Sequence, residues 1–173
     1  RFINASVEEL TNTLLNQFNE DMADFGEKGY ASLNVDYDVI TNNDFWFTLK
    51  ISVTETAASS NTYYEFYHID IERGQLAQLS DLFIDNEDYI FAISKNIKSQ
   101  MIEQIEADFS VVYWLESHED NMSFHKIEEN QSFYWSDTGD LVIVFDEYEV
   151  APGYMGNPEF VIPRAVYSEY LKK

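Results

Sequence analysis

The spacing of the hydrophobic residues changes several times along the chain, and it constrains the fold more than any other feature. Ser6 and Glu9 have the spacing of a helix capping box, and a hydrophobic set then recurs at steps of three and four residues. This set consists of Leu10, Leu14, Phe18, Met22 and Phe25. Further along, the spacing becomes two, first over residues 33–39 and then over residues 45–53. The first pattern predicts a helix, and the second predicts a hairpin with one buried face.

The second half of the chain shows the same two periods. An aromatic strand at residues 63–71 and a helical turn at 79–83 precede a helix with one apolar stripe. The stripe consists of Ile90, Ile93, Ile97, Met101 and Ile105. Strands follow at 132–135, 140–145 and 159–163. We therefore predict an α+β fold in which a largely antiparallel sheet packs against two or three helices.

The chain length fits one ordinary domain. The sequence has 173 residues and 45% hydrophobic residues, enough to bury a core. It contains no internal repeat and no low-complexity linker. We expect a single domain over residues 1–173, with a helix and hairpin in the half at 1–62 and the remaining elements in the half at 63–173.

Acidic residues dominate the charge. The 32 Asp and Glu against 10 Lys and Arg give a formal net charge of -22. A field of this sign repels nucleic acid and anionic lipid, and it speeds encounter with cationic proteins. The alternative is that the charge only maintains solubility. No cysteine is present, which excludes disulfides, thiolate nucleophiles and cysteine zinc sites.

No familiar catalytic or metal-binding pattern is present. The histidines, His68, His118 and His125, are scattered, and His68 alternates with aromatic residues as a strand-face residue would. The sequence lacks H-E-x-x-H and G-x-S-x-G, and with so many carboxylates chance pairs are expected. We therefore expect no cofactor, no metal and no enzymatic activity, although a hydrolase with an unrecognised carboxylate pair remains an alternative.

The segment "YEVAPGYMGNPEF" at residues 148–160 holds two of the three prolines and two of the six glycines. Proline fixes φ, and glycine permits conformations that other residues avoid. We predict that residues 148–150 finish a central strand and that residues 152–156 form a stiff tip that presents Tyr154. The alternative is a simple turn in which Tyr154 and Met155 pack inward.

Two stretches, "YHIDIERGQLAQLSDLF" and "LVIVFDEYEVAPGYMGNPEFVIP", resemble the extracytoplasmic domain of RsiV-type bacterial anti-sigma factors. The same domain occurs beside cell-wall deacetylases of the PdaC type. In that family a strand ending in Asp leads through a Gly turn to Leu-x-Asp-Leu-Phe, here Asp70, Gly74 and residues 79–83. A later strand in the family is followed by Tyr-Glu-Ile-Ala-Pro, then by a Gly, and then by a strand that ends in Pro. In this chain these parts are residues 148–152, Gly156 and residues 162–163. The order and spacing agree over residues 63–163, apart from "IDI", where the second Ile replaces a usual polar residue.

The resemblance implies a receptor that binds lysozyme, a strongly cationic protein, and couples this binding to proteolysis of the anti-sigma factor under cell envelope stress. It implies that an Ala-Pro-x-Tyr turn enters the lysozyme cleft, with a second contact from a loop. Carried over by position, the partner-binding residues are Pro152, Gly153, Tyr154 and Met155, with Ser59, Ser60, Asn61 and Thr62 in the loop. In this loop "AASSN" replaces the family's sequence of the Gly-Gly-Ala-His kind.

The resemblance also implies an extracytoplasmic location at the cell surface. Because the chain begins at Arg1, we expect a trimmed product whose full-length form carries a membrane anchor. The alternative function is a peptidoglycan-binding or glycan-binding module that accompanies a cell-wall deacetylase, with exposed aromatic residues holding the glycan.

Overall fold

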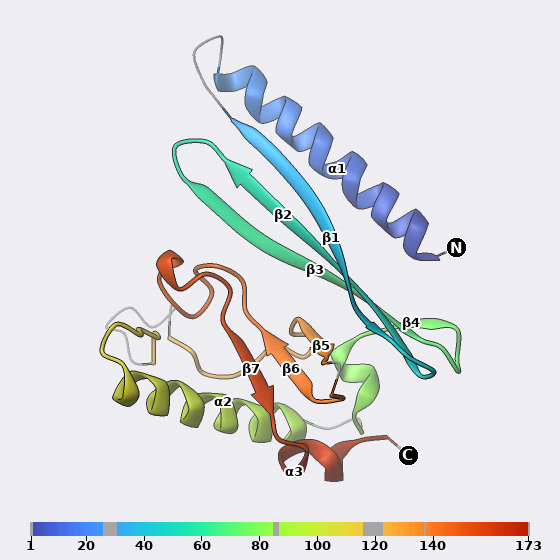
Figure 1. Ribbon diagram of the computed structural model, residues 1–173, viewed down its shortest axis with the longest axis vertical. Coiled ribbons are helices and arrows are strands. Elements are labelled where there is room, and N and C mark those ends of the chain that lie inside the picture. Colours follow the sequence, from blue (N-terminus) through green and yellow to red (C-terminus); the bar gives the residue numbers. More distant parts are fainter. Residues whose placement is uncertain (1, 26–30, 85–86, 116–122, 137, 173) are drawn as a thin grey trace.

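The computed structural model describes residues 2–25, 31–84, 87–115, 123–136 and 138–172 (Figure 1). Its helices and strands, in chain order, are α1 (Phe2–Phe25), β1 (Ser32–Asn42), β2 (Trp46–Thr56), β3 (Ser60–Asp70), β4 (Gln75–Ala77), η2 (Leu79–Leu82), α2 (Asp88–Ala107), β5 (Phe133–Trp135), β6 (Leu141–Val144), η3 (Gly153–Met155), β7 (Glu159–Ile162), α3 (Arg164–Tyr167) and η4 (Ser168–Tyr170). His118 lies outside the described residues.

Helix α1 covers one face of a four-stranded antiparallel sheet with the order β1-β2-β3-β4 (Figure 1). Leu14 from α1 meets Ile51 and Val53 from β2 in a small buried cluster, as the predicted stripe and alternation require. The capping box was wrongly placed, because α1 begins at Phe2 and Ser6 therefore lies inside the helix.

The C-terminal strands form a separate three-stranded antiparallel sheet with the order β5-β6-β7, and α2 lies along it (Figure 1). All four residues of β6 are buried, as expected for a central strand. The stripe of α2 supplies Ile93, Ile97 and Met101 to the larger hydrophobic core. Burial of each such side chain contributes about 1.5–3 kcal/mol to folding.

Aromatic side chains of β3 and β5 join the two sheets. The ring of His68 stacks on Phe133 with centroids 4.0 Å apart, and Phe66 stacks on Tyr134 at 5.7 Å. His68 is buried, and its Nδ1 lies 3.1 Å from the Thr48 hydroxyl. Burial lowers the pKa of His68 to about 4, so the ring is neutral near pH 7. The predicted α+β class is confirmed, and the strands are divided between two sheets.

Candidate functional site: a turn and a hairpin on an acidic surface

The Pro and Gly segment folds as a short 3-10 turn on the surface. Pro152 precedes η3 with φ -61°, and the amide of Met155 donates to its carbonyl at 2.9 Å. Gly156 ends the turn with φ 65° and ψ -138°, a conformation that residues with a Cβ rarely adopt. The segment is therefore held in one conformation by its own backbone.

Tyr154, at the middle of this turn, points outward. Its side chain is 70% exposed, and its hydroxyl donates to the Ser110 carbonyl at 3.2 Å. Met155 is partly buried and packs against the larger core. The turn thus presents the tyrosine and anchors itself through the methionine.

Residues 148–150 do not finish a strand, so that prediction was wrong. Strand β6 ends at Val144, and a turn follows in which the Glu149 amide donates to the Asp146 carbonyl at 3.0 Å. Tyr148 has φ 66°, the only positive φ outside glycine among the described residues. Its ring lies so close to Gly153 that a Cβ on Gly153 would overlap it. A side chain at position 153 would therefore displace the Tyr148 ring, although Gly153 itself has no positive φ.

The structure brings the predicted loop and the predicted turn together. The Thr62 amide donates to Oε2 of Glu147 at 3.0 Å, and Nδ2 of Asn157 donates to the Thr62 carbonyl at 3.1 Å. A third, longer bond joins the Tyr64 amide to Oδ1 of Asp146 at 3.5 Å. The start of β3 and the segment at 146–157 therefore form one surface, in which Thr62 is the part of the loop that contacts the turn segment.

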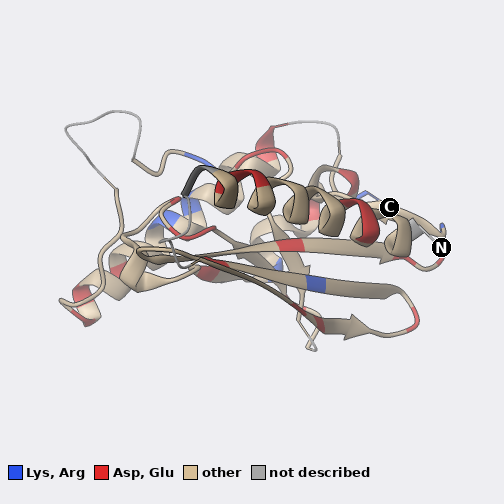
Figure 2. Ribbon diagram, turned by 90° about the horizontal axis from the view of Figure 1, so that it is seen from above, with Lys and Arg blue, Asp and Glu red and all other residues tan. Residues whose placement is uncertain are grey.

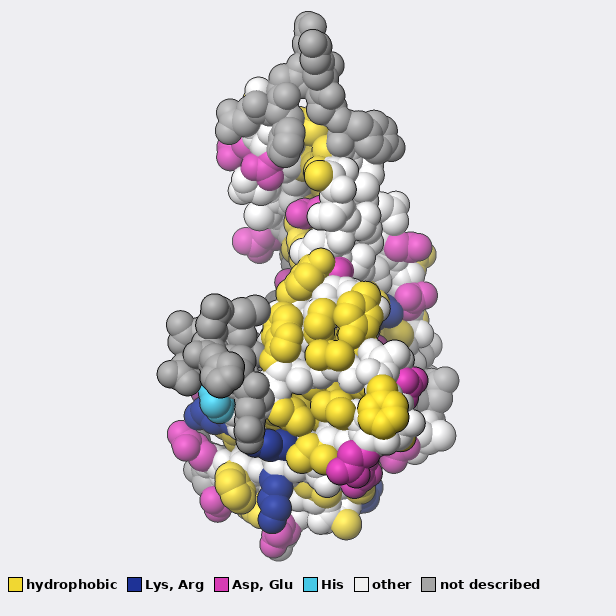
Figure 3. Space-filling model, turned by 90° about the vertical axis from the view of Figure 1, so that its left-hand side faces the viewer, with side chains coloured by type: hydrophobic (Ala, Val, Ile, Leu, Met, Phe, Trp, Pro, Cys, Tyr) yellow, Lys and Arg dark blue, Asp and Glu magenta, His cyan; other side chains and the backbone are white. Residues whose placement is uncertain are grey.

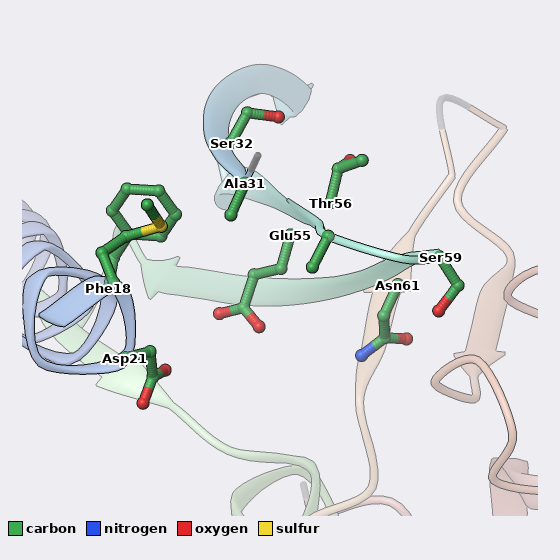
Figure 4. A pocket seen from close by; sticks show the side chains of 10 residues that line it. Phe18, Asp21, Ala31, Ser32, Glu55, Thr56, Ser59 and Asn61 are labelled. Carbon is green, nitrogen blue, oxygen red and sulfur yellow. The ribbon is translucent and has the colours of Figure 1, made fainter. Parts of the chain in front are cut away.

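The rest of the loop faces a different cavity. Ser59, Ser60 and Asn61 are exposed, and Ser59 and Asn61 line a cavity of about 370 Å³ between the hairpin and α1 (Figure 4). Glu55 and Asp21 also line this cavity. The eight predicted contact residues therefore form two groups. Residues 152–155 and Thr62 belong to one surface, whereas Ser59, Ser60 and Asn61 form a loop tip on the side of α1.

Hydrophobic side chains gather on this side of the molecule (Figure 3). Phe109, just beyond α2, is 95% exposed, and Tyr148 is 54% exposed. Neither Phe109 nor Glu147 was predicted to be a contact residue. The residues "DFS" at 108–110 could have indicated a turn that exposes Phe109, because Asp and Ser favour turns. In the structure the Ser110 amide donates to Oδ1 of Asp108 at 2.8 Å and closes this turn.

Carboxylates surround this surface. Asp and Glu are spread over the molecule, whereas Lys and Arg are few (Figure 2). Burial raises the pKa of Glu65, and the neighbouring charge of Asp146 raises it further. Burial also raises the pKa of Asp146 and of Glu149. In all three groups burial is the main cause, because it removes the water that would solvate the ionised carboxylate.

Within the described ranges, no group of three or more His, Asp or Glu side chains could hold a metal ion. None of the helices described is long and apolar enough to cross a bilayer.

Comparison with known proteins finds a matching family and a named relative. Residues 80–165 match a family described as a protein of unknown function, DUF3298. The chain is 43% identical over 145 residues to the anti-sigma-V factor RsiV of Bacillus subtilis strain 168, covering 84% of this chain. It spans only 50% of that relative, so it corresponds to about half of its length. The relative's name describes an anti-sigma factor and not an enzyme.

Two solved structures share the fold. A DUF3298-family protein from Bacteroides fragilis superposes with a TM-score of 0.62 at 20% identity, over 98% of this chain and 66% of that one. A DUF3298-family protein from Pseudomonas aeruginosa superposes with a TM-score of 0.57 at 16% identity, over 90% of this chain and 68% of that one.

Proposed function

The chain belongs to the family of RsiV-type anti-sigma factor domains, and from this premise we propose that it is an extracytoplasmic receptor domain that binds lysozyme. The full-length protein is anchored in the membrane, and binding is coupled to its regulated proteolysis. The observation that carries this proposal is the outward-facing Tyr154 on a turn that the backbone fixes in advance.

The preformed turn favours tight binding. An interface that is already ordered loses little conformational entropy on docking, so more of its contact energy appears as affinity. An exposed tyrosine offers a large apolar ring with a polar tip, which is typical of the residues that dominate binding energy. The hydroxyl of Tyr154 is held by one long bond to a carbonyl, and it is free to exchange this partner for one in the lysozyme cleft.

The charges favour a cationic partner. The whole chain carries a net charge of -22, and three carboxyl groups with raised pKa values lie in the segment before the turn or in the middle of β3. A cationic protein would stabilise the ionised forms of Glu65, Asp146 and Glu149. The charge distribution therefore supports lysozyme over an anionic or neutral protein.

The hydrogen bonds to Thr62 connect the turn segment to the N-terminal half of the chain, so a structural change on binding can be transmitted there. Glu147 and Asn157 connect the turn segment to β3 through the backbone of Thr62. Strand β3 pairs with β2 along its whole length, and β2 packs on α1 through Ile51 and Val53. A displacement of the turn is thus transmitted to the N-terminal helix through contacts that already exist.

The variant Tyr154→Ala tests the site. We expect it to weaken binding to a C-type lysozyme by roughly 30-fold or more, which corresponds to the loss of a dominant contact of about 2 kcal/mol or more. Surface plasmon resonance with immobilised lysozyme would measure the affinity, and thermal unfolding would show that the fold is retained. Tyr37→Ala is the matched control, because Tyr37 is 67% exposed on the edge strand β1.

Different results would refute the proposed binding site and the proposed function. Equal affinities for the wild type and Tyr154→Ala would refute the assignment of the turn as the contact. Failure of the wild-type domain to bind any C-type lysozyme would refute the function itself.

A further inference from the structure

A second cavity lies away from the turn, where the two sheets meet near the C-terminus. Its volume is about 410 Å³, and the hairpin between β1 and β2, the end of β3, β5, η2 and the C-terminal residues line it. In Figure 1 this region lies at the right, around β4 and the C-terminus, whereas the segment that contains η3 lies at the left. The cavity therefore shares no residue with the proposed lysozyme surface.

Aromatic rings form one wall of this cavity. Trp46 and Trp135 contact each other with ring centroids 6.2 Å apart and planes tilted by 39°. Phe45 stands beside them and is 69% exposed. Trp46 and Trp135 are partly buried, so the three residues together offer an aromatic surface of the kind that lines ligand pockets.

The backbone, and not side-chain packing, holds Phe45 in place. Oδ1 of Asn43 accepts hydrogen bonds from the amides of Phe45 and Trp46, each at 2.9 Å. The Ile71 amide donates to the Phe45 carbonyl, also at 2.9 Å. These bonds fix the backbone of Phe45 at the rim of the cavity, and its ring is exposed there.

Trp135 supplies an unsatisfied donor. Its indole nitrogen is buried, and it has no hydrogen-bond partner within the described part of the chain. A buried donor without an acceptor costs about 1–3 kcal/mol, and native structures seldom retain one without a reason. Because this atom is closed off from solvent, a ligand in the cavity would reach it only after the Trp135 side chain moved.

Three cationic residues line the same cavity. Although the chain has only 10 Lys and Arg against 32 acids, Arg73, Arg164 and Lys172 all line this cavity. Arg73 is paired with Asp70 at 3.6 Å, whereas Arg164 and Lys172 form no ion pair with any described residue. Nζ of Lys172 donates to the Ser80 carbonyl at 3.5 Å, and the carboxylates of Asp70 and Asp81 also line the cavity. The charges of Arg164 and Lys172 are not paired with any described carboxylate, so they can attract an anion in a molecule whose overall field repels anions.

We propose that this cavity binds a saccharide unit that carries an anionic group. The C–H face of a sugar ring is apolar and stacks on Phe45 and Trp46, as apolar ligand faces do on aromatic pocket walls. The carboxylates of Asp70 and Asp81 accept from its hydroxyl groups. Arg164 and Lys172 bind the anionic group through charge-assisted hydrogen bonds. The inference is independent of lysozyme binding, since it concerns another face and another ligand.

Tryptophan fluorescence provides a direct assay, because two of the three tryptophans line the cavity. In a Trp114→Phe background all the signal comes from Trp46 and Trp135. We would titrate this protein with N-acetylmuramic acid, N-acetylglucosamine 6-phosphate and neutral N-acetylglucosamine. We expect a saturable change with one or both anionic sugars, at about tenfold or more lower concentration than with the neutral sugar. The two anionic arms distinguish a carboxylate ligand from a phosphate ligand.

Paired variants locate the site. The double variant Arg164→Gln, Lys172→Gln should remove the preference for the anionic sugar and leave the weak binding of the neutral sugar unchanged. Lys95→Gln, Lys98→Gln makes the same change of charge on α2, outside this cavity, and should retain the preference. Phe45→Ala, at an exposed position, should weaken binding of all the sugars.

Three results would overturn the proposal. The first is that none of the sugars binds saturably up to roughly 10 mM. The second is that the Arg164 and Lys172 double variant still prefers the anionic sugar. The third is that a glutamate-rich peptide binds and the sugars do not. The last result would assign the cavity to an acidic protein segment.

Discussion

Substitution of the two glycines in the candidate turn should have different physical consequences. Gly156 has φ 65° and ψ -138°, with open space around its Cα, so an added Cβ would strain the backbone without a clash. Gly153 has no positive φ, and an added Cβ would instead collide with the Tyr148 ring.

We therefore predict that Gly156→Ala lowers the free energy of unfolding by about 1–3 kcal/mol. Gly153→Ala should change stability less, because the exposed Tyr148 ring can move aside, but it should weaken lysozyme binding by altering the surface. Urea unfolding and binding measurements on both variants would test this. Equal losses of stability in the two would contradict the distinction.

His68 gives the fold a defined sensitivity to acid. Its pKa is about 4 in the folded protein and about 6.5 in the unfolded chain, so the unfolded state binds the proton first as the pH falls. The contribution of the neutral ring is complete above pH 6.5 and is lost between pH 6.5 and pH 4, by about 3 kcal/mol in total. The raised pKa values of the buried carboxyls act in the opposite sense over the acid range.

The variant His68→Gln should therefore lose less stability than the wild type between pH 6.5 and pH 4. Urea unfolding at a series of pH values would measure the slope. His125→Gln, at an exposed position, is the control and should retain the slope of the wild type. An unchanged slope in His68→Gln would show that the acid sensitivity arises elsewhere.

At the scale of elements, one side chain connects the turn segment to the N-terminal sheet. Glu147 accepts from the Thr62 amide at 3.0 Å, and Thr62 lies near the start of β3. The variant Glu147→Ala should expose this amide and speed its hydrogen exchange by about fivefold to 30-fold, corresponding to the loss of a bond to a carboxylate. Glu147→Gln should keep most of the protection, since an amide oxygen also accepts. Equal exchange in the wild type and Glu147→Ala would exclude a connecting role.

The same elements show what sequence patterns can and cannot predict. The helix and the two strands follow from local periodicity and were predicted correctly, but the buried face predicted for the hairpin was wrong for β1, where Val35, Tyr37 and Val39 are exposed. The contact of Thr62 with Glu147 joins residues 85 positions apart, and no local pattern specifies it. The conformation of Tyr148 escaped prediction for a related reason, since tertiary contacts and not its own preference hold a tyrosine at positive φ. The division into two sheets likewise depends on which aromatic rings meet between β3 and β5.

At the scale of the whole molecule, the net charge of -22 should govern the rate of association more than the lifetime of the complex. Raising the ionic strength from about 0.1 M to about 1 M shortens the Debye length from about 10 Å to about 3 Å. We expect the association rate with lysozyme to fall by about tenfold or more over this range. Stopped-flow mixing would measure it.

Tyr154→Ala is the informative control for this experiment. Because the substitution leaves the net charge unchanged, the variant should retain the salt dependence of association while it dissociates faster. An association rate that does not respond to salt would show that the acidic field takes no part in the encounter.

The two hydrophobic clusters are unequal, and this divides the molecule into cooperative units of different stability. Among the described residues, 19 buried side chains form the C-terminal cluster, whereas the cluster beneath α1 has only Leu14, Ile51 and Val53. Segments with few buried apolar contacts open at a lower free energy than the whole molecule. We therefore expect helix α1 to open at a lower free energy than the C-terminal unit, so that its amides exchange with solvent before those of α2.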